Sequence, residues 1–239
     1  MIKGLYCHRR IIPNIERGTK MNKAKKSQAI RTALHTRKQL ALKFLKILFY
    51  LHAASLGISL IKYLPVPYSL TAWAGRILSV GMIVCLFSLA SIAPGYRLAG
   101  GVRAVVLAQN VIFALLPAPI LFSWYQSATS LMIVRIVYGA VLVLTWLATW
   151  FEYNSHAGLA SVTSRGLAKW WIILFAGSLL VSVLGTVLSW GAAYLSWDFL
   201  PLNTVNVIIG ILSRVMDALY LWLLYHLIAG VRNADTASA

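Results

Sequence analysis

The sequence predicts an all-α, polytopic integral membrane protein in which six transmembrane helices are arranged as three antiparallel hairpins, with both termini cytoplasmic. Three observations lead to this fold class. Hydrophobic residues make up 60% of the 239 residues and charged residues 11%, whereas soluble domains are about 45–50% apolar and about 25% charged. The apolar residues form continuous runs rather than the alternating pattern of a transmembrane β-barrel. Lys and Arg collect on alternate sides of these runs.

Six apolar stretches are long enough to cross a hydrocarbon core, which needs about 20 helical residues. They are predicted at 44–64, 70–92, 104–125, 131–151, 170–192 and 205–227. Each has to be a helix, because lipid offers no partner for free backbone groups. Together they form a predicted transmembrane domain at 40–230, followed by a short cytoplasmic tail at 231–239.

The connections between these stretches are short, which favours antiparallel neighbours. Pro65 and Pro67 end the first span, and Pro201 precedes the sixth. The longest connection, 152–169, is predicted between the fourth and fifth spans. Pro117 and Pro119 predict a kink in the outer half of the third span.

Orientation follows from the distribution of basic residues. Residues 1–46 contain 13 Lys or Arg and one acid, Glu16, whereas the loops at 65–69, 126–130 and 193–204 contain no Lys or Arg. Lys62 and Arg76 lie near that second side. Because cytoplasmic loops carry an excess of Lys and Arg, both termini are predicted in the cytoplasm. The bias and the short loops favour a bacterial inner membrane.

Residues 1–39 form a basic cytoplasmic arm, of which 1–20 are expected to be disordered, with Met21 as an alternative translation start. From 23 to 46, apolar residues recur at helical spacing between basic ones. Such a cationic segment is attracted to anionic lipid headgroups, with a binding free energy of about 1 kcal/mol per basic residue. The simplest role of the arm is to set topology. Docking to lipid or to a protein partner is the alternative, and a mitochondrial transit peptide is a further one. For the chain as a whole, a homo-oligomer is the alternative to a separate protein partner. Nucleic acid is not an expected partner, because 23–43 has no aromatic residue for base stacking.

The sixth span carries the strongest candidate for a site. Five residues of this span follow one another at steps of three or four and therefore lie on one stripe of the helix: Asn206, Gly210, Arg214, Asp217 and Leu221. Arg214 and Asp217 lie about halfway across the bilayer, where each charge needs a partner. They either form a self-neutralised structural pair or belong to a substrate or ion pathway. Arg135, near the outer end of the fourth span, either snorkels outward or faces this site.

Other polar residues within the spans have structural explanations. Glu152 and His156 are four residues apart at the inner end of the fourth span and are interpreted as a structural pair, since two ligands do not make a metal site. His52 and His226 are expected to be satisfied by packing, and Gln109 and Asn110 to bond between helices. A small-residue face for helix packing is predicted in the fifth span at Ser178, Ser182, Gly185, Thr186 and Ser189. Cys7 and Cys85 are not expected to form a disulfide.

The function predicted first is a non-enzymatic accessory or assembly subunit whose cationic arm docks to lipid or to a partner. The alternative is a small transporter or channel with a polar site in the middle of the sixth span. A membrane enzyme is not expected, because the chain has no Gly-rich phosphate loop, zinc-protease motif or nucleophile elbow. No cofactor and no metal are predicted.

Overall fold

All the regular secondary structure of the described residues is helical. The computed structural model describes residues 11–61, 67–117, 128–195 and 202–234. Its helices are α1 (Ile11–Ile61), α2 (Tyr68–Leu89), α3 (Gly95–Leu115), α5 (Ala128–Thr163), α6 (Arg165–Leu195) and α7 (Leu202–Asn233). Each of the six contains a stretch long and apolar enough to cross a membrane. The prediction of an all-helical, multi-pass membrane protein is confirmed at this level.

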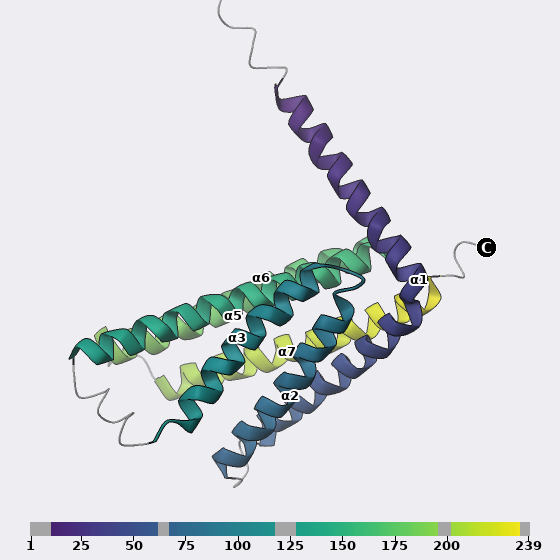
Figure 1. Ribbon diagram of the computed structural model, residues 1–239. Helices are drawn as coiled ribbons and strands as arrows, with labels where there is room; N and C mark the ends of the chain where they lie inside the picture. Colours follow the sequence, from purple (N-terminus) through teal and green to yellow (C-terminus); the bar gives the residue numbers. More distant parts are fainter. Residues whose placement is uncertain (1–10, 62–66, 118–127, 196–201, 235–239) are drawn as a thin grey trace, which may run out of the picture.

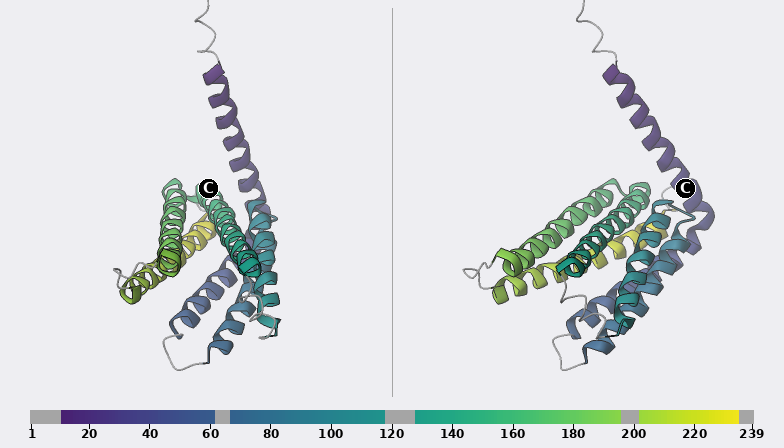
Figure 2. Two further views of the ribbon diagram at one scale, coloured as in Figure 1. Left: turned by 90° about the vertical axis from the view of Figure 1, so that its left-hand side faces the viewer. Right: turned by 60° about the vertical axis from the view of Figure 1, so that its left-hand side comes forward.

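The helices form a ring in sequence order. Each helix packs against the next one along the chain, and α7 returns to pack against α1. In addition, α5 contacts both α1 and α7 across the ring. The ribbons in Figures 1 and 2 converge at one end and spread apart at the other. The grouping into three hairpins and the cytoplasmic termini stay predictions.

The hydrophobic core occupies the end of the ring where the helices converge. It is built from the C-terminal halves of α2, α5 and α7, the N-terminal halves of α3 and α6, and the middle of α1. Its large, fully buried side chains include Trp171, Tyr96 and Leu45. In the opposite half of the ring most described side chains are exposed or half-buried, so the helices there enclose a space rather than a packed core.

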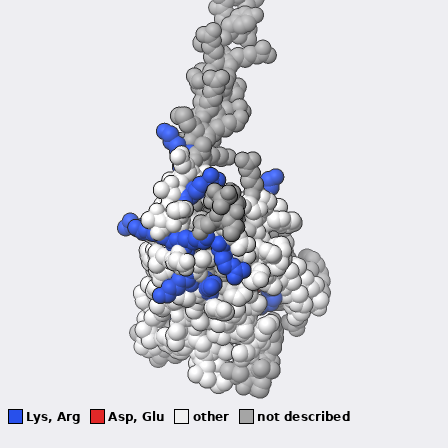
Figure 3. All heavy atoms as spheres, turned by 90° about the vertical axis from the view of Figure 1, so that its right-hand side faces the viewer, with Lys and Arg blue, Asp and Glu red and all other residues white. Residues whose placement is uncertain are grey.

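Basic side chains gather at this same end, which we call the basic end. Its exposed residues include Arg37, Lys43, Lys46, Arg97, Lys169 and Arg232. Figure 3 shows Lys and Arg side chains clustered over this face, with none of Asp or Glu visible. The charge asymmetry of the sequence is therefore also an asymmetry of the folded ring.

α1 extends beyond the ring at the basic end. It bends at Arg37, where φ is −123° and ψ is 26°, and its N-terminal half then points away from the other helices (Figure 1). Ile30 and Leu34, inside the predicted arm, are 4% and 3% exposed and belong to the core. Of the segment 1–20 that was expected to be disordered, residues 11–20 are helical and residues 1–10 lie outside the described part.

The predicted kink in the third span is wrong where the structure can test it. α3 begins at Gly95, earlier than expected, and ends at Leu115, because Leu116 is extended with ψ 132°. A residue before proline is pushed out of the helical region, so Pro117 ends the helix instead of bending it. Pro119 lies outside the described residues.

The predicted loop at 152–169 is also wrong. α5 continues to Thr163 and α6 begins at Arg165, so only Ser164 separates the two helices. The fall in hydropathy after Phe151 suggested a loop exposed to water. In the structure Glu152, Ser155 and His156 are instead buried inside the ring.

Candidate functional site

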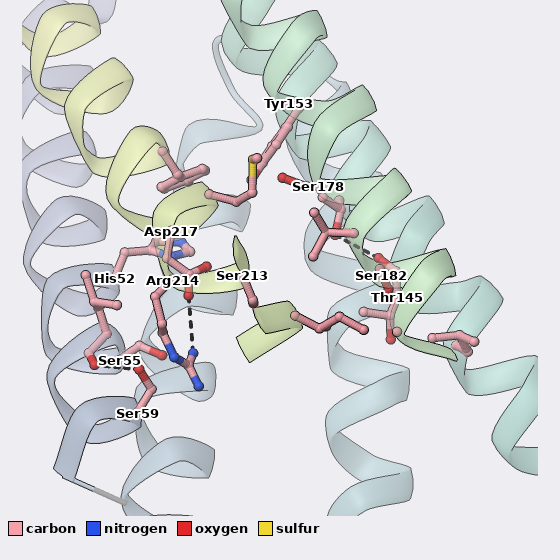
Figure 4. A pocket seen from close by; sticks show the side chains of 18 of the residues that line it. His52, Ser55, Ser59, Thr145, Tyr153, Ser178, Ser182, Ser213, Arg214 and Asp217 are labelled. Atoms are coloured by element: carbon pink, nitrogen blue, oxygen red, sulfur yellow. Dashed lines mark hydrogen bonds and ion pairs between the residues drawn. The ribbon is translucent and has the colours of Figure 1, made fainter. Parts of the chain in front are cut away.

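A cavity of about 790 Å³ lies between the helices on the side of the core away from the basic end. Its volume falls within the roughly 300–1,000 Å³ of small-molecule sites. Hydroxyl groups line much of it, from Ser55, Ser59, Ser79, Thr145, Thr149, Ser178, Ser182, Thr186 and Ser213. Figure 4 shows side chains of α1, α5, α6 and α7 facing one another across this space. A cavity with so many hydroxyl groups offers hydrogen-bond partners to water or to a polar solute.

A buried ion pair lies where the cavity meets the core. Glu152 on α5 is fully buried, and Arg103 on α3 donates from Nη2 to its Oε2 at 2.5 Å. Tyr220 on α7 donates its hydroxyl to Oε1 at 2.6 Å. Both Arg103 and Tyr220 also line the cavity. The carboxylate is thus hidden behind two side chains that form the floor of the cavity.

His156 continues this hydrogen-bonded network into the core. Its Nε2 lies 3.0 Å from the hydroxyl of Tyr220 and its Nδ1 lies 2.7 Å from the hydroxyl of Tyr96. The ring of Trp171 on α6 packs on the imidazole with centroids 4.5 Å apart. Both ring nitrogens of this buried histidine therefore have partners.

His52 connects the network to the cavity. Its Nε2 lies 3.7 Å from Oε1 of Glu152, and its ring packs on Tyr220 with centroids 4.3 Å apart. The side chain is 20% exposed and faces the cavity (Figure 4). Within the described residues, this buried Nε2 atom of His52 has no hydrogen-bond partner. We call His52, Tyr96, Arg103, Glu152, His156 and Tyr220 the floor cluster.

The floor cluster was missed by sequence reasoning, which treated Glu152 and His156 as a local pair. Three other helices supply the remaining members. One signal was present: Arg103 and Glu152 have opposite charges and lie at the same predicted side of the membrane. A buried carboxylate needs a paired charge and further hydrogen bonds, and this requirement could have joined them.

Only part of the polar stripe predicted on the sixth span lines the cavity. Arg214 and Asp217 line it, with Nη1 and Oδ2 3.4 Å apart and side chains 32% and 49% exposed (Figure 4). Asn206 is exposed near the start of α7, and Arg135 is exposed near the start of α5. Neither is among the described residues that line the cavity.

The small-residue face of the fifth span also lies at the cavity. Ser178, Ser182, Gly185 and Thr186 line it, and Trp146 of α5 donates from Nε1 to Oγ of Ser182 at 2.9 Å. The side chain of Ser189 lies outside the described residues. His226 is exposed and packs on Trp222 instead of entering the core.

The arrangement is suited to acid–base chemistry. A carboxylate, two imidazoles and two phenols lie within hydrogen-bonding or near-contact distance of one another, and histidine is the side chain that most readily exchanges protons near neutral pH. Across the described ranges, no three His, Cys, Asp or Glu side chains are grouped to hold a metal ion.

No protein-family model, curated protein or solved structure matches this chain. Its function therefore has to be inferred from the cavity and the floor cluster.

Proposed function

We propose that the chain is a small membrane transport protein whose cavity binds a polar solute. The observation that carries this proposal is the cavity of about 790 Å³, lined by hydroxyls and by Arg103, Arg214 and Asp217, among helices apolar enough to cross a membrane. Polar and ionisable groups within a membrane are costly unless they face partners or water, and they commonly mark solute pathways. This role develops the transporter alternative raised by the sequence.

The shape of the ring supports a one-sided state of a transporter. The core closes the ring at the basic end, and the cavity occupies the half where the helices diverge. With the basic end in the cytoplasm, as the excess of Lys and Arg favours, the cavity faces the exterior of the cell. A bacterial plasma membrane is the proposed location.

Uptake into proteoliposomes tests this proposal. Purified protein is reconstituted and offered a panel of labelled amino acids, sugars, carboxylates and nucleosides. We expect uptake of at least one class, and loss of that uptake in Asp217→Asn. Asn206→Ala, on the same helix but exposed away from the described lining, is the matched control and should transport normally.

Two results would count against transport through this cavity. One is the absence of uptake of every class by folded wild-type protein. The other is an unchanged rate in Ser213→Trp, which places a bulky side chain in the cavity and does not depend on the Arg214–Asp217 pair. An Asp217→Asn protein that fails to assemble, beside a folded Ser213→Trp protein that no longer transports, would assign the pair a structural role and keep the cavity as the transport site.

A non-enzymatic docking role is the second candidate, and the basic end favours it. The N-terminal half of α1 leaves the ring (Figure 1) and carries exposed Lys25, Arg31 and Arg37. Such a cationic helix beside a membrane attracts anionic lipid headgroups. We expect added phosphatidylglycerol to raise the melting temperature more than phosphatidylcholine does, and Arg31→Gln/Arg37→Gln to reduce that difference. Equal effects of the two lipids on wild-type protein would contradict lipid docking.

A further inference from the structure

We propose that Tyr96, His156, Tyr220 and Glu152 form a proton-conducting chain between the basic end of the ring and the floor of the cavity. The inference deepens the proposed transport function, because it gives the same cavity a proton as a second cargo. The four residues come from α3, α5 and α7. They lie within the closed half of the ring, and Tyr96, the second residue of α3, is the member nearest the basic end.

The hydrogen bonds are continuous. Tyr96 and His156 are joined at 2.7 Å, His156 and Tyr220 at 3.0 Å, and Tyr220 and Glu152 at 2.6 Å. Tyr96, His156 and Glu152 are 0% exposed and Tyr220 is 3% exposed. A chain of this kind lets protons hop between fixed groups without entry of bulk water.

The hydrogens of the chain all point in one direction. Tyr220 donates its only hydroxyl proton to Glu152, so its oxygen can only accept from Nε2 of His156. The Nδ1 atom of that neutral imidazole then carries no proton and accepts from the hydroxyl of Tyr96. A single tautomer of His156 satisfies every bond, and each inner member both donates and accepts, as a proton relay requires.

One transfer moves a proton from the basic end to Glu152. A hydronium ion that reaches Tyr96 from the basic end during a local opening of the core gives a proton to the oxygen of Tyr96, and the proton of that hydroxyl passes to Nδ1 of His156. The Nε2 proton of His156 passes to the oxygen of Tyr220, and the proton of Tyr220 passes to Oε1 of Glu152. One proton enters, Glu152 gains one, and no bond between heavy atoms changes. Rotation of the two hydroxyls and proton exchange on His156 restore the starting orientation.

His52 provides the exit to the cavity. Its Nε2 lies 3.7 Å from Oε1 of Glu152 and its side chain lines the cavity, so a small movement brings it into bonding range. Its buried Nε2 takes the proton from Glu152, and the imidazole then releases the proton on Nδ1 to cavity water. Among the described residues, the charged and titratable groups around this exchange are Arg103 from α3, Tyr153 and His156 from α5, and Arg214, Asp217 and Tyr220 from α7. Arg103 keeps Glu152 in place during it.

Proton flux into proteoliposomes tests the chain. The vesicles contain a trapped pH-sensitive dye, and a potassium gradient with valinomycin sets the membrane potential, with no solute added. We expect wild-type protein to conduct protons above the rate of protein-free vesicles, and Tyr220→Phe to lower that rate at least tenfold. Tyr225→Phe removes the same hydroxyl from an exposed tyrosine of α7 and should conduct normally.

A structural network gives a different result. If the hydroxyl of Tyr220 only supports packing, Tyr220→Phe lowers the melting temperature while the flux per folded protein stays at the wild-type rate, and the chain is refuted. Tyr96→Phe provides a second variant at the far end of the network, and its unchanged flux would also refute the chain. The solute assay is independent: uptake by wild-type protein that lacks proton flux would preserve transport and overturn only the proton chain.

Discussion

Removal of Arg103 should destabilise the protein more than its own contacts suggest. Glu152 is 0% exposed and its Oε2 depends on Arg103, so Arg103→Met leaves a buried carboxylate without a counter-charge. Breaking a buried ion pair from one side costs about 3–5 kcal/mol. Because Arg103 is 28% exposed and faces the cavity, water can replace part of its solvation of the carboxylate. We therefore expect a loss of about 3 kcal/mol in the free energy of unfolding.

The rescue of this variant is the sharper part of the prediction. Glu152→Gln removes the uncompensated charge and keeps an oxygen that accepts from Tyr220. The double variant Arg103→Met/Glu152→Gln should therefore regain at least about 1.5 kcal/mol relative to Arg103→Met, since the charge is the main cost. Reversible unfolding in mixed micelles of dodecyl maltoside and sodium dodecyl sulfate, followed by circular dichroism, measures these differences.

A matched control separates charge pairing from the loss of any arginine. Arg97→Met changes an exposed arginine of α3 at the basic end and should stay within about 0.5 kcal/mol of wild type, as surface substitutions do. The reasoning is refuted if Arg103→Met costs no more than Arg97→Met, or if Glu152→Gln does not restore stability to Arg103→Met.

Two further predictions concern packing at the basic end. An added Cβ at Gly230 would lie 3.0 Å from Oγ1 and 3.1 Å from Cβ of Thr163, whereas one at Gly101 meets nothing within 4 Å. Gly230→Ala should therefore melt at a lower temperature than Gly101→Ala, which gains about 0.5–1 kcal/mol of helix stability. Equal melting temperatures would contradict the close approach of α7 to α5. Deletion of residues 1–29 should leave the free energy of unfolding unchanged, whereas Leu34→Ala, at a side chain 3% exposed, should cost about 2 kcal/mol. A larger loss from the deletion than from Leu34→Ala would show that residues 1–29 also contribute to the core.

The sequence predicts the helical fold because the signals for membrane spans are local. A run of apolar residues is sufficient to identify each span, and all six predicted stretches overlap helices in the structure. Helix ends were harder, since they depend on single residues. Pro117 was expected to bend a helix that instead ends before it, and Glu152 was expected to begin a loop that is instead helical.

The candidate site was predictable only where it is local. Arg214 and Asp217 are three residues apart on one helix, and their pairing and common face follow from that spacing. The contacts of Glu152 with Arg103, Tyr220 and His52 join residues 49 or more positions apart along the chain. Helix periodicity carries no information about which faces of distant helices meet, so this part of the site required the structure.

Transport through the ring requires that water fill the cavity between its helices. Ser213→Cys and Val215→Cys, each in a Cys7→Ser/Cys85→Ala background, place a thiol on the lining and on the exposed outer face of α7, respectively. In proteoliposomes treated with a membrane-impermeant thiol reagent from the side opposite the basic end, we expect Ser213→Cys to be labelled and Val215→Cys to stay unlabelled. Labelling of Val215→Cys with Ser213→Cys unreactive until the protein is denatured would contradict it.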